Sequence, residues 1–180
     1  MPWKSFGAFA SRKGFFIRGK FMLEIKAGCL YFVDDSFFEK VNDPYRKINY
    51  ENTSRPHYMA FFDTKTSLYW LVPCSSKVEK YEKIIEQKQK NRKSTDTIKI
   101  IKIQDKKTVL LFQDMFPTCA HYIKEQYVRG GQAVYIADPK MVAELEKTAK
   151  KIINLLKRGV RFTPTQPNIL AIEELMQQKI

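Results

Sequence analysis

This 180-residue sequence has no apolar run long enough to span a bilayer, which excludes an integral membrane protein built on spanning helices. Cysteine and histidine are also scarce. The three cysteines, Cys29, Cys74 and Cys119, lie far apart and form no C-x-x-C pair. That pattern supports neither a disulfide framework nor a zinc site and is typical of a reduced cytosol. With only His57 and His121, a histidine-rich metal site is not expected.

Several catalytic motifs are missing as well. The sequence contains no P-loop, no dinucleotide-binding fingerprint and no serine-hydrolase elbow. No carboxylates are paired with ligand spacing, and Asp34-Asp35 is interpreted as a helix cap rather than a magnesium site. We therefore expect neither a metal nor a cofactor. The absence of a metal site does not exclude nuclease chemistry, because a metal-free nuclease can use the 2′-hydroxyl of RNA as its nucleophile, a route that DNA does not offer.

Positive charge is what the sequence has in excess. Lysine and arginine number 32 against 19 acidic residues, for a net charge of +13. A field of this size attracts polyanions, which means nucleic acid, an acidic partner or an anionic membrane surface. The 44% hydrophobic and 13% aromatic content indicates a globular chain, and the length suits one compact domain.

The first 21 residues contain no acid and five basic residues. Such a segment is typical of a targeting peptide, of a disordered basic tail, or of residues ahead of a true start at Met22, and the sequence leaves these alternatives open. Residues 22 to 180 are expected to form a single domain.

Strands and helices alternate in short segments along that domain. Aromatic and β-branched residues predict one hairpin from residues 56–62 and 68–72 and a second from residues 97–103 and 108–112. Apolar spacing and caps predict helices after Asp34, after Ser76, from Pro139 to Gly159, and over residues 170–176. These elements indicate an α+β fold on a small antiparallel sheet or barrel.

The junction Ser75-Ser76-Lys77 joins a predicted strand to a predicted helix. Ser76 and Glu79 match the S-x-x-E capping box, which is a purely structural interpretation. The same helix start also presents unpaired N–H groups to an anion, and two hydroxyls with a lysine add donors and a charge. These groups can stabilise a phosphorane-like transition state, and both interpretations can hold together.

Cations and aromatic rings alternate around this junction, as in proteins that bind single-stranded RNA. Cations on the helix after Ser76 are candidate phosphate contacts, although some also form ordinary helix-surface pairs. A second basic group lies at Lys147, Lys150, Lys151, Lys157, Arg158 and Arg161. His57 titrates near neutral pH and is a candidate base, but its position inside a strand favours a structural role.

The residues also resemble a known family. The runs Tyr31-Phe32-Val33-Asp34 and Asn42-Asp43-Pro44-Tyr45, then Arg55-Pro56-His57-Tyr58, Leu68-Tyr69-Trp70 and Pro73-Cys74-Ser75-Ser76-Lys77, resemble ToxN-like toxins of type III toxin–antitoxin systems. Within the ToxN, AbiQ, CptN and TenpN subfamilies the similarity is greatest to CptN.

The resemblance implies a compact antiparallel β-barrel of the Kid/MazF toxin type with peripheral helices. It implies a cytoplasmic, metal-independent, sequence-preferring endoribonuclease toxin that leaves 2′,3′-cyclic phosphate and 5′-hydroxyl ends and acts in abortive infection and phage resistance. The antitoxin is a small repeat-derived RNA, held with the toxin in a closed hetero-oligomer.

The resemblance also assigns residues. Ser75 and Ser76 match the family's hydroxyl pair, Lys77 its lysine, and Lys47 or Arg55 an upstream basic residue, with Tyr31 and Tyr50 as the tyrosines. The candidate catalytic residues are Ser75, Ser76, Lys77, Lys47 and Tyr50. The candidate RNA-binding residues are Tyr31, Tyr45, Arg55, His57, Lys80, Lys83, Lys88, Lys90, Arg92 and Lys93. The alternatives are a non-catalytic RNA-binding regulator and, from the basic N-terminal segment, a peripheral membrane protein.

Overall fold

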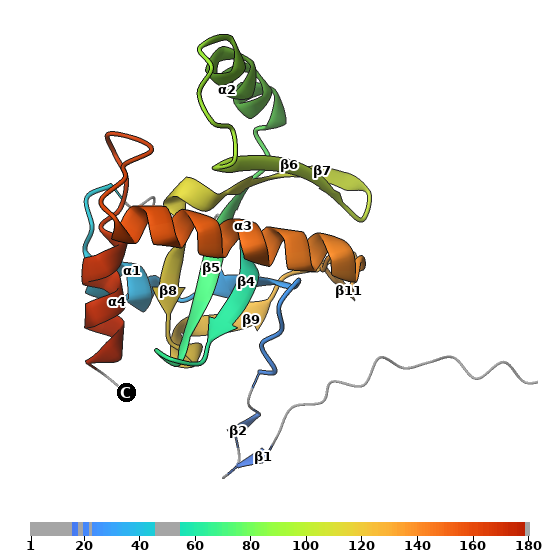
Figure 1. The fold of residues 1–180 in the computed structure, drawn as a ribbon. Helices are drawn as coiled ribbons and strands as arrows, with labels where there is room; N and C mark the ends of the chain where they lie inside the picture. Colours follow the sequence, from blue (N-terminus) through green and yellow to red (C-terminus); the bar gives the residue numbers. More distant parts are fainter. Residues whose placement is uncertain (1–15, 18–19, 22, 46–54, 179–180) are drawn as a thin grey trace, which may run out of the picture.

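An antiparallel sheet forms the centre of the molecule in the computed structural model, which describes residues 16–17, 20–21, 23–45 and 55–178 (Figure 1). The strand order is β6 (Ile98–Ile103), β7 (Lys106–Leu111), β5 (Leu68–Ser75), β4 (His57–Asp63), β3 (Leu30–Val33) and β9 (Ile123–Gln126). β8 (Phe116–Thr118) pairs with the first half of β5, and β7 pairs with its end. The predicted α+β fold with an antiparallel sheet is confirmed. Within the described residues no pairing joins β6 to β9, so the sheet stays open.

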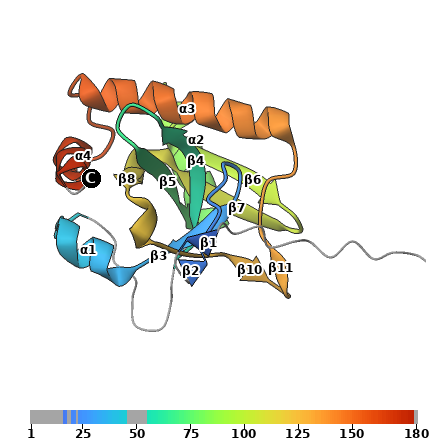
Figure 2. The ribbon, with the colours of Figure 1, turned by 90° about the horizontal axis from the view of Figure 1, so that it is seen from below.

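Helices cover both faces of this sheet, as two perpendicular views show (Figures 1 and 2). α3 (Pro139–Lys157) crosses one face, and its apolar stripe packs on a core that contains Tyr58, Trp70 and Val72. α1 (Asp35–Val41) and α4 (Ile169–Gln177) cover the other face, over Met59 and Leu71. Neighbouring residues of β4 and β5 therefore enter opposite cores, because successive side chains of a strand point to opposite sides.

The ends of these helices follow the capping rules. The Asp34 side chain accepts a hydrogen bond from the Ser36 N–H at the start of α1. Asp138 does the same for Lys140 at the start of α3, with Pro139 at the first helical position. Gly159, at φ +84°, follows the end of α3 as a left-handed stop. All three features were predicted from the sequence and are confirmed.

α2 (Val78–Lys90) lies outside the two main cores and packs on the β6–β7 hairpin. Tyr81 is its buried anchor, and it meets Ile98, Val109 and Leu111 in a third, smaller apolar cluster. Figure 1 shows the helix as a projection above the rest of the molecule. The remaining described elements are short: strands β1 (Phe16–Ile17), β2 (Lys20–Phe21), β10 (Val128–Arg129) and β11 (Gln132–Ala133), and 3-10 turns η1 (Phe112–Asp114) and η2 (Ala120–Tyr122).

Candidate active site

The register of β4 and β5 brings an arginine and a serine together. His57, the first residue of β4, pairs with Pro73, and the Cys74 N–H donates to the Pro56 carbonyl at 3.1 Å, which continues the pairing to the residue before β4. Arg55 therefore lies opposite Ser75. In a position of this kind the two Cα atoms are about 4.5–5.5 Å apart.

Alternation along the two strands assigns these residues to one face. Arg55 lies two residues before His57, the first residue of β4, and shares its face of the sheet, while Pro73 and Ser75 share the matching face of β5. Cys74 points the other way into the core, where burial raises the pKa of its thiol to about 12. The Cys74 thiol is therefore fully protonated at neutral pH and is not a nucleophile.

A small pocket, the Arg55 pocket, opens on this face. Its walls come from α1, the segment after it, β4, β5, η1, β8 and the loop before α4: Phe38, Tyr45, Arg55, His57, Pro73, Asp114, Phe116 and Pro167. The Tyr45 ring is 50% exposed at the rim, whereas His57 is 2% exposed, with its ring edge-on to Phe116 at 5.3 Å. The pocket thus combines two opposite charges with aromatic rings, one of which is open to solvent.

The charges of the pocket reach the start of α2. The pKa of the Tyr81 hydroxyl is raised first by burial and then by the Asp114 carboxylate, and the Arg55 guanidinium acts in the opposite direction. Tyr81 is therefore within the electrostatic range of both pocket charges. Pro73 lines the pocket and Ser75 follows two residues later on the same face of β5, so the junction begins beside the pocket.

The junction itself differs from the predicted capping box. Lys77, not Ser76, is the N-cap of α2, and its side chain makes no capping hydrogen bond. The Lys77 N–H donates instead to Ser75 Oγ at 3.3 Å, and the Val78 N–H donates to the Ser76 carbonyl at 2.9 Å. The prediction was wrong because pairing with Val109 of β7 keeps Ser75 extended and delays the helix by one residue. The side chains of Ser76 and Lys77 are exposed.

Tyr31 lies in the core and not in the pocket. Its side chain is 1% exposed, its hydroxyl accepts a hydrogen bond from the Lys26 N–H at 2.8 Å, and it donates to the Glu24 carbonyl at 3.3 Å. Burial raises the pKa of Tyr31 above its usual value. A ring enclosed in this way offers no face to a nucleotide base, which corrects the prediction that Tyr31 stacks on RNA. Lys47 and Tyr50 lie outside the described residues.

The predicted phosphate contacts lie on α2 and just after it. Lys80, Lys83, Lys90, Arg92 and Lys93 are exposed. Lys88 is half-buried, its Nζ donates to Thr97 Oγ1 at 3.0 Å, and burial lowers its pKa. Lys88 therefore holds the end of α2 to the start of β6, whereas the other five cations face solvent.

The prediction from sequence missed part of the pocket wall. Asp114, Phe38, Phe116 and Pro167 come from four separate elements, and only the folded topology brings them together. The sequence contains one weak indication of Asp114, because it is a single acidic residue between two apolar strand segments. Among the described residues no three histidines, cysteines or carboxylates are grouped as metal ligands. No helix in the described part of the chain is long and apolar enough to cross a membrane.

Comparison with known proteins gives a structural match only. No family model and no curated protein matches the sequence. Eleven chains of solved structures are similar to this one. One of them is AbiQ, described as a lactococcal anti-phage endoribonuclease belonging to the type III toxin–antitoxin system. The match has a TM-score of 0.66 at 10% sequence identity and covers 84% of this chain and 96% of AbiQ. The expected resemblance to this group of toxins is confirmed at the level of the fold.

Proposed function

We propose that this protein is an endoribonuclease toxin of a type III toxin–antitoxin system and that it cuts RNA at the Arg55 pocket and the adjoining Ser75-Ser76-Lys77 junction. The observation that carries the proposal is the position of Arg55 opposite Ser75 on the pocket face, in a fold similar to that of an endoribonuclease. The predicted chemistry and the net charge of +13 point to the same substrate.

The proposed reaction is an internal transesterification. The 2′-oxygen loses its proton and attacks the adjacent phosphorus, the bond from phosphorus to the 5′-oxygen breaks, and the departing 5′-oxygen takes up a proton from water, so the products carry a 2′,3′-cyclic phosphate and a 5′-hydroxyl. Negative charge increases on the phosphoryl oxygens in the transition state. Positioned cations and hydroxyl donors stabilise that charge most when they are held in place before the reaction.

Each residue has a proposed role. Arg55 binds the scissile phosphate with its planar donors, and Ser75 and Ser76 orient the phosphate or the 2′-hydroxyl. Lys77 neutralises the charge of the transition state. His57 receives the proton of the 2′-hydroxyl, since imidazole titrates near neutral pH and this ring lines the pocket. A His57→Gln variant that keeps the full pH dependence of the wild type removes His57 from this role.

The finer properties of the family belong to the same proposal. They are metal independence, sequence preference, a strand arrangement of the Kid/MazF toxin type, greater similarity to CptN than to the other subfamilies, cytoplasmic location, action in phage resistance by abortive infection, and inhibition by a small repeat-derived RNA in a closed hetero-oligomer. Lys47 and Tyr50 remain predicted catalytic residues.

The test is cleavage of a labelled single-stranded RNA by the purified chain, with and without chelator, beside the same oligonucleotide in 2′-deoxy form. We expect cleavage of the RNA alone, unchanged by chelator, with cyclic phosphate ends. Complete loss of activity in chelator rejects the metal-free mechanism, and cleavage of the deoxy substrate rejects attack by the 2′-oxygen. Binding of RNA without any cleavage supports the non-catalytic regulator instead.

A further inference from the structure

A row of cations follows one side of α3. Lys140, Lys147, Lys151 and Arg158 are separated by seven, four and seven positions, and at 3.6 residues per turn these spacings return to the same face of a helix. The face extends over 18 positions, or about 27 Å. Glu144 is the acidic residue on this face. Glu146 lies on another side of the helix, where it pairs with Lys150.

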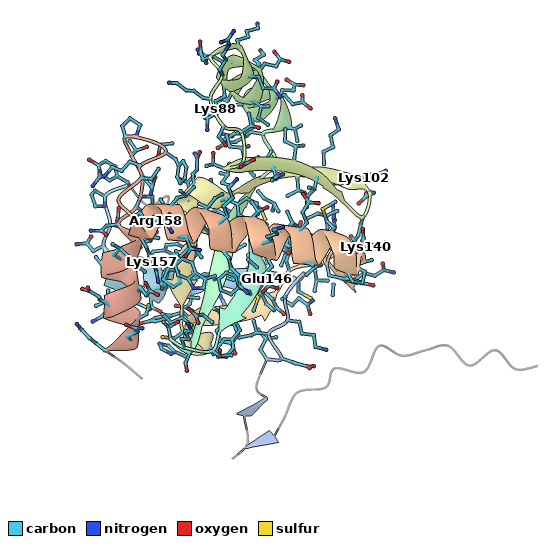
Figure 3. The ribbon with its side chains drawn as sticks, viewed as in Figure 1. Lys88, Lys102, Lys140, Glu146, Lys157 and Arg158 are labelled. Atoms are coloured by element: carbon cyan, nitrogen blue, oxygen red, sulfur yellow. The ribbon has the colours of Figure 1, made fainter. Side chains whose placement is uncertain are left out.

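Two ion pairs show which part of the molecule adjoins this face of α3. Glu144 lies 3.7 Å from Lys99 of β6, and Lys151 lies 2.7 Å from Asp96 in the loop before β6. The face therefore borders the β6 edge of the molecule, below α2. Figure 3 shows Lys140 and Arg158 at its two ends and Lys88 above it on α2.

These two ion pairs use the carboxylates of Glu144 and Asp96, and three cations of the face remain without a carboxylate partner in the described part of the chain. Lys140, Lys147 and Arg158 are exposed, and none has a carboxylate within 4.0 Å among the described residues. Uncompensated cations at fixed spacing on a rigid helix attract a polyanion more than they stabilise the fold, because exposed charges without partners contribute little to folding.

Aromatic residues are missing from this surface. The sequences of α3, of β6 and of residues 91–97 contain no phenylalanine, tyrosine or tryptophan. Single-stranded RNA is held by stacking its bases on such rings, whereas paired RNA hides its bases and is contacted through phosphates and 2′-hydroxyls. The Arg55 pocket, with the exposed ring of Tyr45, is suited to single-stranded RNA. The cationic face of α3, which has no aromatic rings, is suited to paired RNA.

We propose that the α3 face, made of Lys140, Lys147 and Arg158, binds the backbone of base-paired RNA and is separate from the site that cuts. The inference rests on the proposed function for the presence of RNA, and it adds a second surface with a different RNA structure as its ligand. α3 packs on the sheet face opposite the one that carries the pocket residues Phe38 and Phe116, so the two proposed RNA surfaces are separate.

The experiment compares two triple variants of the full chain that lose the same charge. K140Q/K147Q/R158Q removes the three positive charges of the α3 face. The control variant, K40Q/K65Q/K124Q, removes three exposed positive charges from α1, the β4–β5 turn and β9. Binding of a short blunt RNA duplex and of an unpaired oligonucleotide is measured by fluorescence anisotropy at several salt concentrations. Thermal unfolding confirms that both variants are folded, and cleavage of unpaired RNA is measured alongside.

We expect the first variant to bind the duplex at least 10-fold more weakly at about 0.1 M salt, with a salt slope lower by about 2 to 3, since each phosphate contact contributes about 0.7–0.9. Cleavage of unpaired RNA stays within about 2-fold, and the control variant keeps duplex affinity. Equal losses in the two variants overturn the inference. So does binding of the wild type to vesicles of anionic phospholipid but not to the duplex. A chain that binds duplex through this face but cuts no RNA supports the surface and overturns the proposed activity, so the two failures are distinguishable.

Discussion

Arg55 stands opposite Ser75 where the β4–β5 pairing continues ahead of His57, with both side chains on the strand face that carries the pocket residues His57 and Pro73. Paired strands fix this distance more firmly than loops do, since a shift of one residue would send both side chains to the other face. The hydrogen bond from the Cys74 N–H to the Pro56 carbonyl holds the pair in register. A phosphate bound between a guanidinium and a hydroxyl would therefore meet donors that are already positioned.

Replacing Arg55 tests this arrangement. Arg55→Ala should lower kcat/KM for RNA cleavage about 100-fold or more, as removal of one positioned donor does in other enzymes. Arg55→Lys should recover only part of the loss, because lysine keeps the charge but not the planar pair of donors. Lys65→Ala, in the exposed β4–β5 turn, is the control and should cut at the wild-type rate. Wild-type activity in Arg55→Ala would remove Arg55 from the site.

Substitutions in the Ser75-Ser76-Lys77 junction distinguish an effect on stability from an effect on cleavage. Ser75→Ala removes the acceptor of the Lys77 N–H and should lower the free energy of unfolding by up to about 1 kcal/mol as well as slowing cleavage. Lys77→Ala and Ser76→Ala remove exposed side chains and should leave Tm unchanged, while cleavage falls about 100-fold for Lys77. Thermal unfolding and initial cleavage rates measure the two effects. Wild-type cleavage by folded Ser76→Ala and Lys77→Ala proteins would show that the site is elsewhere.

Two tyrosines predicted to contact RNA should behave in opposite ways. Tyr31→Phe loses hydrogen bonds to the Lys26 N–H and the Glu24 carbonyl and should be less stable by about 1 kcal/mol, with unchanged affinity for RNA. Tyr45→Ala removes an exposed ring from the pocket rim and should weaken binding of unpaired RNA by about 1–3 kcal/mol without changing Tm. Denaturant titration and RNA titration give both values. The reverse pattern would return Tyr31 to the RNA site.

The ion pair between Lys151 and Asp96 gives a pH-dependent prediction. The hydrogen bond from Lys151 is the main cause that lowers the pKa of Asp96 from its usual value of about 3.9. A carboxyl with a lowered folded pKa stabilises the fold fully above its unfolded pKa, and that contribution is lost as the pH falls through the folded pKa.

Lys151→Gln should therefore be less stable than the wild type at pH 7, by less than about 1 kcal/mol because the pair is exposed. The difference should shrink as the pH falls below about 4. Lys147→Gln, on the same face of α3 and without a carboxylate partner among the described residues, should show no such dependence. Urea unfolding at several pH values measures the difference in the free energy of unfolding between Lys151→Gln and the wild type. A difference that stays constant across the pH range would contradict the role given to the Lys151–Asp96 pair.

Local features of this fold were predictable because they depend on neighbours in sequence. Asp34 and Asp138 cap their helices as expected, since an aspartate before an apolar helical stripe has its acceptor within reach of the first N–H groups. Both long hairpins were predicted too, because alternation and turn residues are read over a few positions.

Features that depend on distant partners were not predictable. The β5–β7 pairing holds Ser75 extended and moves the cap of α2 from Ser76 to Lys77. Tyr31 lies in a strand covered on both sides, so its sequence shows no polar alternation that would have marked the ring as buried. Asp114 joins Arg55 in the pocket only through the path of the chain after β7. Sequence therefore indicated the junction and part of the pocket, while long-range pairing determined their geometry.

The packing of α2 on the β6–β7 hairpin has a dynamic consequence. Among the described clusters, α2 contributes only to the third, whereas β4 and β5 supply residues to both large cores. A helix held by few side chains opens at a lower free energy than the strands beneath it, so its amides should exchange with deuterium well before those of β4 and β5. Lys77 lies at the boundary between this separately opening unit and the slowly exchanging sheet. The proposed site therefore spans two parts of different stability. Arg55 and Ser75 belong to the slowly exchanging sheet, and Lys77 belongs to the start of the helix that opens at a lower free energy.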